Sequence, residues 1–236
     1  MLNRSTVAAL TILAAGTSTA LADVRAFHGS PDAPAVDVLV NDTIRAFEGL
    51  AFEGVTGYAP LASDTYNFKV VPAGGGPGDA VIDADLMIDG MTDYTIVATD
   101  VLANITPIVL VDDNTLDAGN ARIRFFHGSA DAPAVDIRVA NGGPTLFSNV
   151  SFQESGGYVT VPGGTYDLEV VVAGTNNVAL AVPGLSVSNN TVYSVFATGL
   201  LSDSTLNAVA TVDAVPAPGA LALLGLGGLA AARRRR

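Results

Sequence analysis

The feature of this sequence that most constrains its fold is a repeated phrase. Residues 28–37 read HGSPDAPAVD and residues 127–136 read HGSADAPAVD, so one substitution separates two segments that lie ninety-nine positions apart. The similarity continues downstream, because FEGVTGYAPLASDTYNFKVVPAG in the first copy matches FQESGGYVTVPGGTYDLEVVVAG in the second. Self-similarity at this period indicates a duplicated domain. We therefore expect one domain over residues 23–113, a polar linker over 114–121 and a second domain over 122–213.

Within each copy the short-range period of hydrophobicity is two, which is typical of β-strands. The segment AVDVLVN, residues 35–41, places three valines on one face of a strand, and the matching segment 134–140 does the same with two valines and an isoleucine. Turn signals such as SPDAP, AGGGPGD, PGG and AGTNN recur every ten or so residues. The pattern predicts an all-β protein of two tandem immunoglobulin-like β-sandwich domains, with about seven strands in each.

Charge and cysteine content narrow the range of partners. The chain has a formal net charge of −12 and no cysteine. All of its acidic residues lie between Asp23 and Asp213, so this region is strongly negative. Because a negative surface repels phosphate backbones, we expect no nucleic-acid partner. Without disulfides, each domain must be stabilised by its packed core alone.

The N-terminus predicts export. Residues 1–22 begin with a basic residue, Arg4, continue through an apolar run and end in Ala20-Leu21-Ala22. A basic start, a short apolar centre and an A-x-A-like end are typical of a secretory signal peptide, which would be cleaved after Ala22. We expect a Sec-exported protein, secreted or held at the cell surface.

The C-terminal segment, residues 214–236, has three parts in a characteristic order. Val215, Pro216, Ala217 and Pro218 are followed by an apolar run, and the chain ends in an arginine cluster of Arg233, Arg234, Arg235 and Arg236. The apolar run from Gly219 to Ala232, read as a helix, spans about 21 Å, which is short for a bilayer core of about 30 Å.

This segment resembles the PEP-CTERM sorting signal of Gram-negative bacteria, with Ala217 where the usual motif has glutamate. The resemblance implies that an exosortase-type processing protease is a partner and that the helix enters the inner membrane transiently. A permanent C-terminal anchor is the alternative.

The repeated phrase resembles the opening of the domain-of-unknown-function family numbered 4397, which occurs in exported bacterial proteins, often in tandem. The resemblance implies fold and export, and it supplies no activity. The residues that carry it in the first copy are Arg25, His28, Ser30, Pro31, Asp32, Ala33, Pro34, Ala35, Val36, Asp37 and Val38, and in the second copy Arg124, His127, Ser129, Asp131, Ala132, Pro133, Ala134, Val135 and Asp136.

A structural role is the favoured interpretation of the phrase. We expect Asp32 to cap an Asx-type turn, His28 to donate a ring N–H to a turn carbonyl and Arg25 to pair with Asp37. The second copy keeps the same set as Arg124, His127, Asp131 and Asp136.

We assign no catalytic, cofactor-binding or metal-binding residues. A triad would need an exposed nucleophile, and Ser30 lacks a Gly-x-Ser-x-Gly elbow. Two alternatives stay open: weak Ca²⁺ binding at residues 112–117, and sugar stacking on Tyr58, Tyr66, Tyr158 and Tyr166.

The sequence thus predicts a non-catalytic cell-surface or extracellular-matrix protein with a structural or adhesive role, for example in a biofilm, and with exopolysaccharide or other surface components as partners. A carbohydrate- or calcium-binding surface module is the alternative, and a secreted hydrolase comes third.

Overall fold

The computed structural model describes residues 21–216. Most of the predicted signal peptide and the C-terminal run from Ala217 onward, including the predicted apolar helix, Pro218 and the arginine cluster, lie outside the described residues. The first strand, β1, begins at Leu21, so the last two residues of the predicted signal segment belong to this strand.

Residues rich in valine, isoleucine and threonine form strands throughout, because β-branched side chains pack well on a pleated surface. In the first half two four-stranded sheets form, with the orders β4-β1-β7-β8 and β3-β2-β5-β6. Two short 3₁₀ turns, η1 (Pro77–Asp79) and η2 (Leu102–Asn104), lie in its loops. The strands are β1 (Leu21–His28), β2 (Val36–Val40), β3 (Ile44–Leu50), β4 (Ala59–Ala62), β5 (Asp64–Pro72), β6 (Ile82–Ile88), β7 (Asp93–Thr99) and β8 (Thr106–Asp112).

The second half repeats this topology, with sheet orders β12-β9-β15-β16 and β11-β10-β13-β14. Its strands are β9 (Ala121–His127), β10 (Val135–Val139), β11 (Thr145–Val150), β12 (Ser155–Val161), β13 (Gly164–Val172), β14 (Val178–Val187), β15 (Thr191–Thr198) and β16 (Asn207–Ala214). In both halves the first strand pairs in parallel with the seventh, and the other strand pairs are antiparallel.

The all-β prediction and the duplication are confirmed. Each half has eight strands where the sequence predicted about seven, because the segments before and after the PGG and ASD turns form separate strands in different sheets. The sheets of each half enclose an apolar core, so each half is a β-sandwich. Among residues 21–216 no helix is long and apolar enough to cross a membrane.

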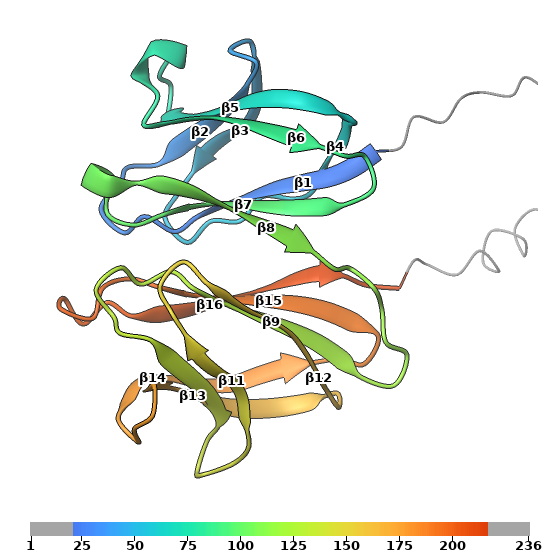
Figure 1. The fold of residues 1–236 in the computed structure, drawn as a ribbon, viewed down its shortest axis with the longest axis vertical. Helices are drawn as coiled ribbons and strands as arrows, with labels where there is room; N and C mark the ends of the chain where they lie inside the picture. Colours follow the sequence, from blue (N-terminus) through green and yellow to red (C-terminus); the bar gives the residue numbers. More distant parts are fainter. Residues whose placement is uncertain (1–20, 217–236) are drawn as a thin grey trace, which may run out of the picture.

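The two sandwiches are stacked so that one sheet of each meets the other (Figure 1). These facing sheets contain β1, β7 and β8 from the first half and β9, β15 and β16 from the second. The connection runs from the end of β8 at Asp112 to the start of β9 at Ala121. The contact between the two copies contains several buried polar and charged side chains, among them Arg25, Asp112, Arg124 and Asp213.

Candidate functional site at the domain junction

Alternation along β1 and β9 places an arginine in the contact between the domains. Val24 and Ala26 point into the first sandwich, and Arg25 and Phe27 therefore point out of it, toward the second. Arg124 occupies the matching position on β9. Both arginines are only 2% exposed, although they lie on the outer faces of their own sandwiches.

Arg25 is bound by residues of both domains. Its Nη2 donates to Asp213 Oδ1 of the second domain at 2.7 Å, and its Nε donates to Thr95 Oγ1 on the neighbouring strand at 2.8 Å. The guanidinium carbon lies 4.6 Å from the centre of the Tyr58 ring, within cation–π range. The guanidinium of Arg25 is thus held by Thr95 and Tyr58 of its own domain and by Asp213 of the second domain.

Arg124 repeats this arrangement in the opposite direction. Its Nη1 lies 2.6 Å from Asp112 Oδ1 of the first domain, and its Nε donates to Ser194 Oγ at 3.0 Å. Nη1 also donates to the carbonyl oxygen of Val111 at 3.1 Å, and the Tyr158 ring centre lies 5.2 Å from the guanidinium. Each arginine therefore pairs with an aspartate of the other domain, an exchange that we call the crossed ion pairs.

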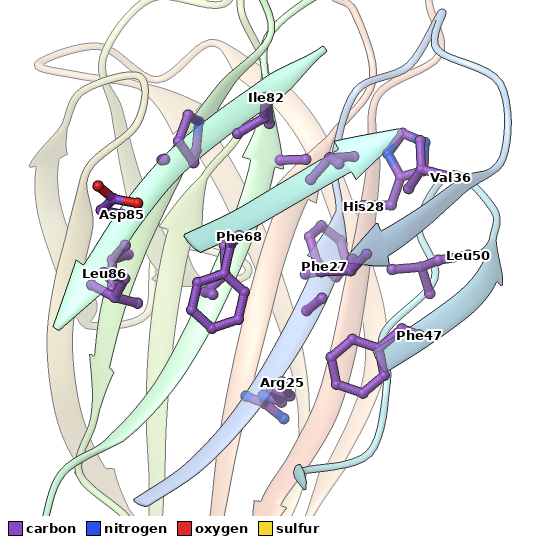
Figure 2. A pocket seen from close by; sticks show the side chains of 18 residues that line it. Arg25, Phe27, His28, Val36, Phe47, Leu50, Phe68, Ile82, Asp85 and Leu86 are labelled. Carbon is purple, nitrogen blue, oxygen red and sulfur yellow. The ribbon is translucent and has the colours of Figure 1, made fainter. Parts of the chain in front are cut away.

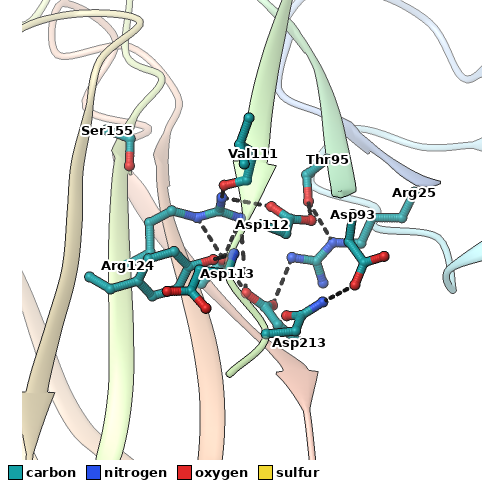
Figure 3. A network of polar contacts seen from close by, with 12 residues as sticks. Arg25, Asp93, Thr95, Val111, Asp112, Asp113, Arg124, Ser155 and Asp213 are labelled. Carbon is teal, nitrogen blue, oxygen red and sulfur yellow. Dashed lines mark hydrogen bonds and ion pairs between the residues drawn. The ribbon is translucent and has the colours of Figure 1, made fainter. Parts of the chain in front are cut away.

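Hydroxyl groups complete the crossed ion pairs (Figure 3). Thr95 donates to Asp112 Oδ2 at 2.6 Å, and its counterpart Ser194 donates to Asp213. Tyr58 also donates to Asp112 Oδ2, at 2.7 Å. Both aspartate side chains are 0% exposed. Such a network is stable only while every charge keeps its partners, because an unpaired buried charge is very costly.

The pKa values of Tyr58 and Tyr158 reflect their burial beside the crossed ion pairs. Burial, followed by the negative charge of Asp112, strongly raises the pKa of Tyr58. Burial likewise raises the pKa of Tyr158 to about 12, against an opposing effect of Arg124. Both phenols are therefore neutral at physiological pH; Tyr58 donates to Asp112, and the Tyr158 hydroxyl accepts the backbone N–H of Asp113 at 3.3 Å.

An apolar cluster seals the junction beside the crossed ion pairs. The rings of Phe27 and Phe196, from different domains, stack with their centres 4.1 Å apart, and Phe126 lies 6.1 Å from Phe196. Leu110 and Val97 pack into the same cluster. At its edge, Glu53 of the first domain accepts hydrogen bonds from Thr198 and Asn207 of the second. The junction thus combines an apolar cluster with buried ion pairs and with hydrogen bonds between the two domains.

The predicted pairing of Arg25 with Asp37 is wrong, because the two side chains belong to different faces of the molecule. Asp37 lies on β2 of the other sheet, where it pairs with Arg45. Its carboxylate also accepts the backbone N–H groups of Gly49 at 2.6 Å and Gly74 at 2.8 Å. These two N–H groups lower the pKa of Asp37, followed by the effect of Arg45. Asp37 therefore ties two loops to the strand between them.

The same correction applies to Asp136, which was expected to pair with Arg124. It accepts backbone N–H groups from Asn149 at 2.7 Å and Gly174 at 3.1 Å, at the positions that match Gly49 and Gly74. All four of these loop residues have positive φ angles between 52° and 81°. The second aspartate of the repeated phrase thus holds two left-handed loop positions in each copy.

The predicted Asx-type turn at Asp32 is also replaced by a longer-range contact. Asp32 Oδ1 accepts the backbone N–H of Leu102, seventy residues away, at 2.6 Å. In the second copy Asp131 accepts the N–H groups of Leu201 at 2.7 Å and Ser202 at 2.8 Å. The first aspartate of the phrase therefore connects its turn to the loop before the last strand of each domain.

The histidines lie as the sequence predicted. His28 Nε2 lies 3.0 Å from the carbonyl oxygen of Pro34, and Nδ1 accepts the backbone N–H of Ser30 at 3.3 Å. His127 makes the same two contacts, with Pro133 and Ser129. Burial lowers the pKa of both histidines, against a smaller opposing effect of the carbonyl contact. Each is a neutral imidazole whose Nε2–H donates and whose Nδ1 accepts.

The acidic segment 112–117, considered for Ca²⁺, directs its carboxylates to protein groups. Asp112 belongs to the crossed ion pairs, Asp113 pairs with Arg122 at 2.6 Å, and Asp117 accepts the N–H of Gly119. The hydrogen bond from Arg122 lowers the pKa of Asp113 well below its usual range. In the part of the chain that the structure describes, no group of three or more His, Cys, Asp or Glu residues is placed to hold a metal ion.

The tyrosines considered for sugar stacking have intramolecular partners. Tyr58 and Tyr158 lie against the arginines of the junction. Tyr66 donates to the carbonyl oxygen of Ala62 at 3.2 Å, and Tyr166 donates to that of Pro162 at 2.7 Å. All four are thus tied to their own sheets or to the junction.

A protein-family model matches most of the chain. The model of the family described as domain of unknown function, DUF4397, matches residues 22–138 and 139–223. The chain belongs to this family. The first match extends past the junction into β9 and β10, so the two matched segments do not coincide with the two sandwiches. The comparison with curated proteins found no match.

Three solved structures are similar to the chain at low levels. The TIE protein of Bacillus anthracis has a TM-score of 0.25 and 11% identity over 77% of this chain, which spans only 34% of that protein. A family 26 carbohydrate-binding module from Eubacterium rectale Amy13K, solved with maltoheptaose, has a TM-score of 0.27 and 13% sequence identity. The match covers 83% of this chain and 98% of the module. A protein from Bacteroides fragilis, described as a putative cell adhesion protein, has a TM-score of 0.21 and 9% sequence identity. The match covers 83% of this chain and 99% of that protein.

Proposed function

We propose that this protein is an exported, non-catalytic component of the cell surface or extracellular matrix, in which two immunoglobulin-like sandwiches act as one stiff spacer. The observation that carries the proposal is the crossed ion pairs, Arg25 with Asp213 and Arg124 with Asp112. Each of these arginines has its buried partner on the other domain, so both ion pairs form in only one placement of the domains. Burying four charges between two domains makes sense where their relative placement must persist under load.

Stiffness suits a structural or adhesive role because a spacer transmits force and presents its outer loops at a fixed distance. Separation of the domains would expose the stacked Phe27 and Phe196 rings and would leave each arginine without its aspartate. Exposure of the apolar rings opposes separation, and the ion pairs fix how the domains meet, because each charge has its buried partner on the other domain. Exopolysaccharide or another surface component is the proposed partner of the outer loops.

The two ends of the chain support export and delivery. The signal-peptide pattern of residues 1–22 would direct the chain through the Sec pathway, and the PEP-CTERM-like segment from Val215 would hold it in the inner membrane until an exosortase-type protease removes the tail. A permanent anchor at the same segment would keep the spacer on the membrane.

The proposal is tested in the native host by fractionation and by mass spectrometry of the protein's C-terminus. A variant that lacks residues 215–236 should leave its normal compartment while its melting temperature stays unchanged. A matched variant with Arg233–Arg236 replaced by glutamine should be mislocalised in the same way. Normal localisation of both variants would refute the sorting role, and recovery of the intact protein in the cytoplasm would refute export.

The structural role is tested separately in a biofilm or adhesion assay. Replacement of both Arg25 and Arg124 by methionine should weaken the matrix while the protein still reaches its compartment. The control is Arg138→Met, which breaks an ion pair away from the junction. Equal adhesion by the wild type and the junction variant would contradict the spacer proposal.

A further inference from the structure

The contacts at the junction are reciprocal. Arg25 of the first domain pairs with Asp213 of the second, and Arg124 of the second domain pairs with Asp112 of the first. The four residues lie on matching strands of the two copies, because β1 corresponds to β9 and β8 corresponds to β16. In an interface between two identical subunits related by a twofold axis, each contact between two residues forms twice in this way. The junction therefore has the contact pattern of a symmetric dimer, although both halves belong to one chain.

Each domain holds its own charged groups in place on this face. In the first domain the Thr95 hydroxyl accepts a hydrogen bond from Arg25 and donates one to Asp112. A serine hydroxyl takes the same place in the second domain, where the set is Ser194, Arg124 and Asp213. An arginine and an aspartate that are joined through a hydroxyl keep their relative positions without the other domain. Each face is therefore prearranged for its partner.

Any two such faces are complementary in charge, because each carries both an arginine and an aspartate. Two further contacts favour a first domain against a second. Phe27 stacks on Phe196 with ring centres 4.1 Å apart, and Glu53 accepts hydrogen bonds from Asn207 at 3.0 Å. Neither pair can form between two first domains or between two second domains. A second copy of the chain therefore offers the first domain the same partner as its own second domain does.

The two copies differ in their cores. Ala26 of the first domain stands where the second has Phe125, whose ring packs in the second core. An apolar cavity of about 60 Å³ borders Ala26, and Figure 2 shows Phe47 and Phe68 beside it. Ala26 points into the first sandwich, away from the junction. The cores have thus changed between the copies, while the arginine and the aspartate of the junction face are the same in both.

The connection between the domains is long enough for the two faces to come apart. Residues 113–120 join Asp112 at the end of β8 to Ala121 at the start of β9, and an extended segment of this length spans up to about 30 Å. Asp113 holds this segment to the second domain through its ion pair with Arg122. The Asp113 side chain is 51% exposed, and an exposed pair contributes little. This ion pair therefore opposes release of the segment only weakly.

We propose that the junction face is also the surface through which two copies of the chain associate, with the first domain of one copy docked on the second domain of another. Each junction in this exchanged form has the same contacts as the junction within one chain, so no new interface is needed. This association is independent of where the protein is delivered and of its role there.

Two effects set the conditions for exchange. Closure within one chain competes with it, because a short linker gives an effective concentration in the millimolar range. The chain also carries a net charge of −12, so that copies repel one another until salt screens the repulsion. The exchanged form is therefore expected where the protein is concentrated and the ionic strength is high.

The first test removes residues 113–120 from the full chain. Asp112 and Ala121 then become neighbours with Cα atoms about 3.8 Å apart. Packed sheets lie about 10 Å apart, so one chain cannot close its own junction. Size-exclusion chromatography with light scattering should show dimers or larger assemblies of this variant. A folded, monomeric deletion variant would overturn the proposal.

Arginine substitutions in the deletion variant show whether the junction face carries the association. Arg25→Met and Arg124→Met together should shift the assemblies to monomers, because each leaves a buried aspartate without its partner. Arg138→Met breaks an ion pair away from the junction and should leave the assemblies intact. Equal association of both variants would refute the assignment to this face.

The second test follows exchange in the chain with its linker intact, and it decides the matter if circular dichroism shows that the deletion variant does not fold. One batch carries a donor dye on Thr65→Cys and another an acceptor dye on Thr165→Cys, at exposed positions of different domains. After mixing, energy transfer between copies should appear slowly, since a buried junction must open, and should grow with protein and salt concentration. Absence of transfer at high concentration would refute exchange, as would transfer that disappears at once on dilution, which indicates a side-by-side contact.

Discussion

Replacement of Arg124 by methionine tests the energetic role of the crossed ion pairs. Methionine keeps much of the apolar stem but removes the charge that Asp112 faces inside the junction. Removing one partner of a buried pair typically costs about 3–5 kcal/mol, since the remaining charge stays buried and unpaired. Thr95 and Tyr58 still donate to Asp112 in the variant, which places our expectation near the lower end, at about 3 kcal/mol.

Two matched variants separate this effect from general disruption. Arg138→Met breaks the pair with Glu169, whose side chains are 18% and 19% exposed, and should cost about 1 kcal/mol or less. Adding Asp112→Asn to Arg124→Met removes the orphaned charge, and the double variant should be more stable than Arg124→Met alone. The free energy of unfolding is measured by urea titration at pH 7.5 with far-UV circular dichroism. Equal losses for Arg124→Met and Arg138→Met would refute the reasoning.

Four further predictions follow from single contacts. Burial lowers the pKa of His28 and His127 below 6.5, so the unfolded chain binds more protons than the folded protein as the pH falls below this value. The contribution of the two histidines to stability should be fully present above pH 6.5 and should decrease as the pH falls from 6.5 toward the lowered pKa values. A urea midpoint that does not change between pH 7.5 and 5.5 would contradict this. Asp37→Ala removes the acceptor of the N–H groups of Gly49 and Gly74 and the partner of the Arg45 guanidinium. The free energy of unfolding, measured by urea titration, should fall by about 1–3 kcal/mol. Glu48→Ala, at a neighbouring exposed carboxylate, should lower it by less than about 0.5 kcal/mol. Asp131→Ala removes acceptors for two N–H groups and Asp32→Ala for one, so the melting temperature should fall further in the former; the reverse order would count against the loop assignment. Millimolar Ca²⁺ should leave the melting temperature unchanged, because the acidic residues at 112–117 are engaged with protein groups, and a chelator-reversible rise would show that they are not.

The sequence predicts the architecture well because its signals are local. Alternation with period two defines the strands, and glycine and proline clusters define the loops between them. The contact of His28 with Pro34 spans six residues and was likewise within reach of local reasoning. Local patterns and the internal repeat suffice for class, duplication and turn positions.

The partners of the charged residues could not be predicted in this way. Arg25 and Asp213 are 188 residues apart and meet only because two whole domains pack together. Asp37 seemed the natural partner of Arg25, but the two strands belong to opposite sheets. The only signal in β1 and β7 was weak: Phe27 and Val97 are apolar although they share a face with Arg25 and Thr95, which suggests that something covers this face. That pattern indicates a second layer over the sheet without naming its residues.

The most direct test of the account is the distance between the two domains in solution. The chain has no cysteine, so Thr65→Cys and Thr165→Cys, both at exposed positions on the far sheets, place one spin label in each domain. Double electron–electron resonance on this pair should give one narrow distance distribution. The same pair with Arg25→Met and Arg124→Met should give a broader one. A broad distribution in the otherwise unchanged protein, or the same width in both, would contradict the claim that the crossed ion pairs lock the domains together.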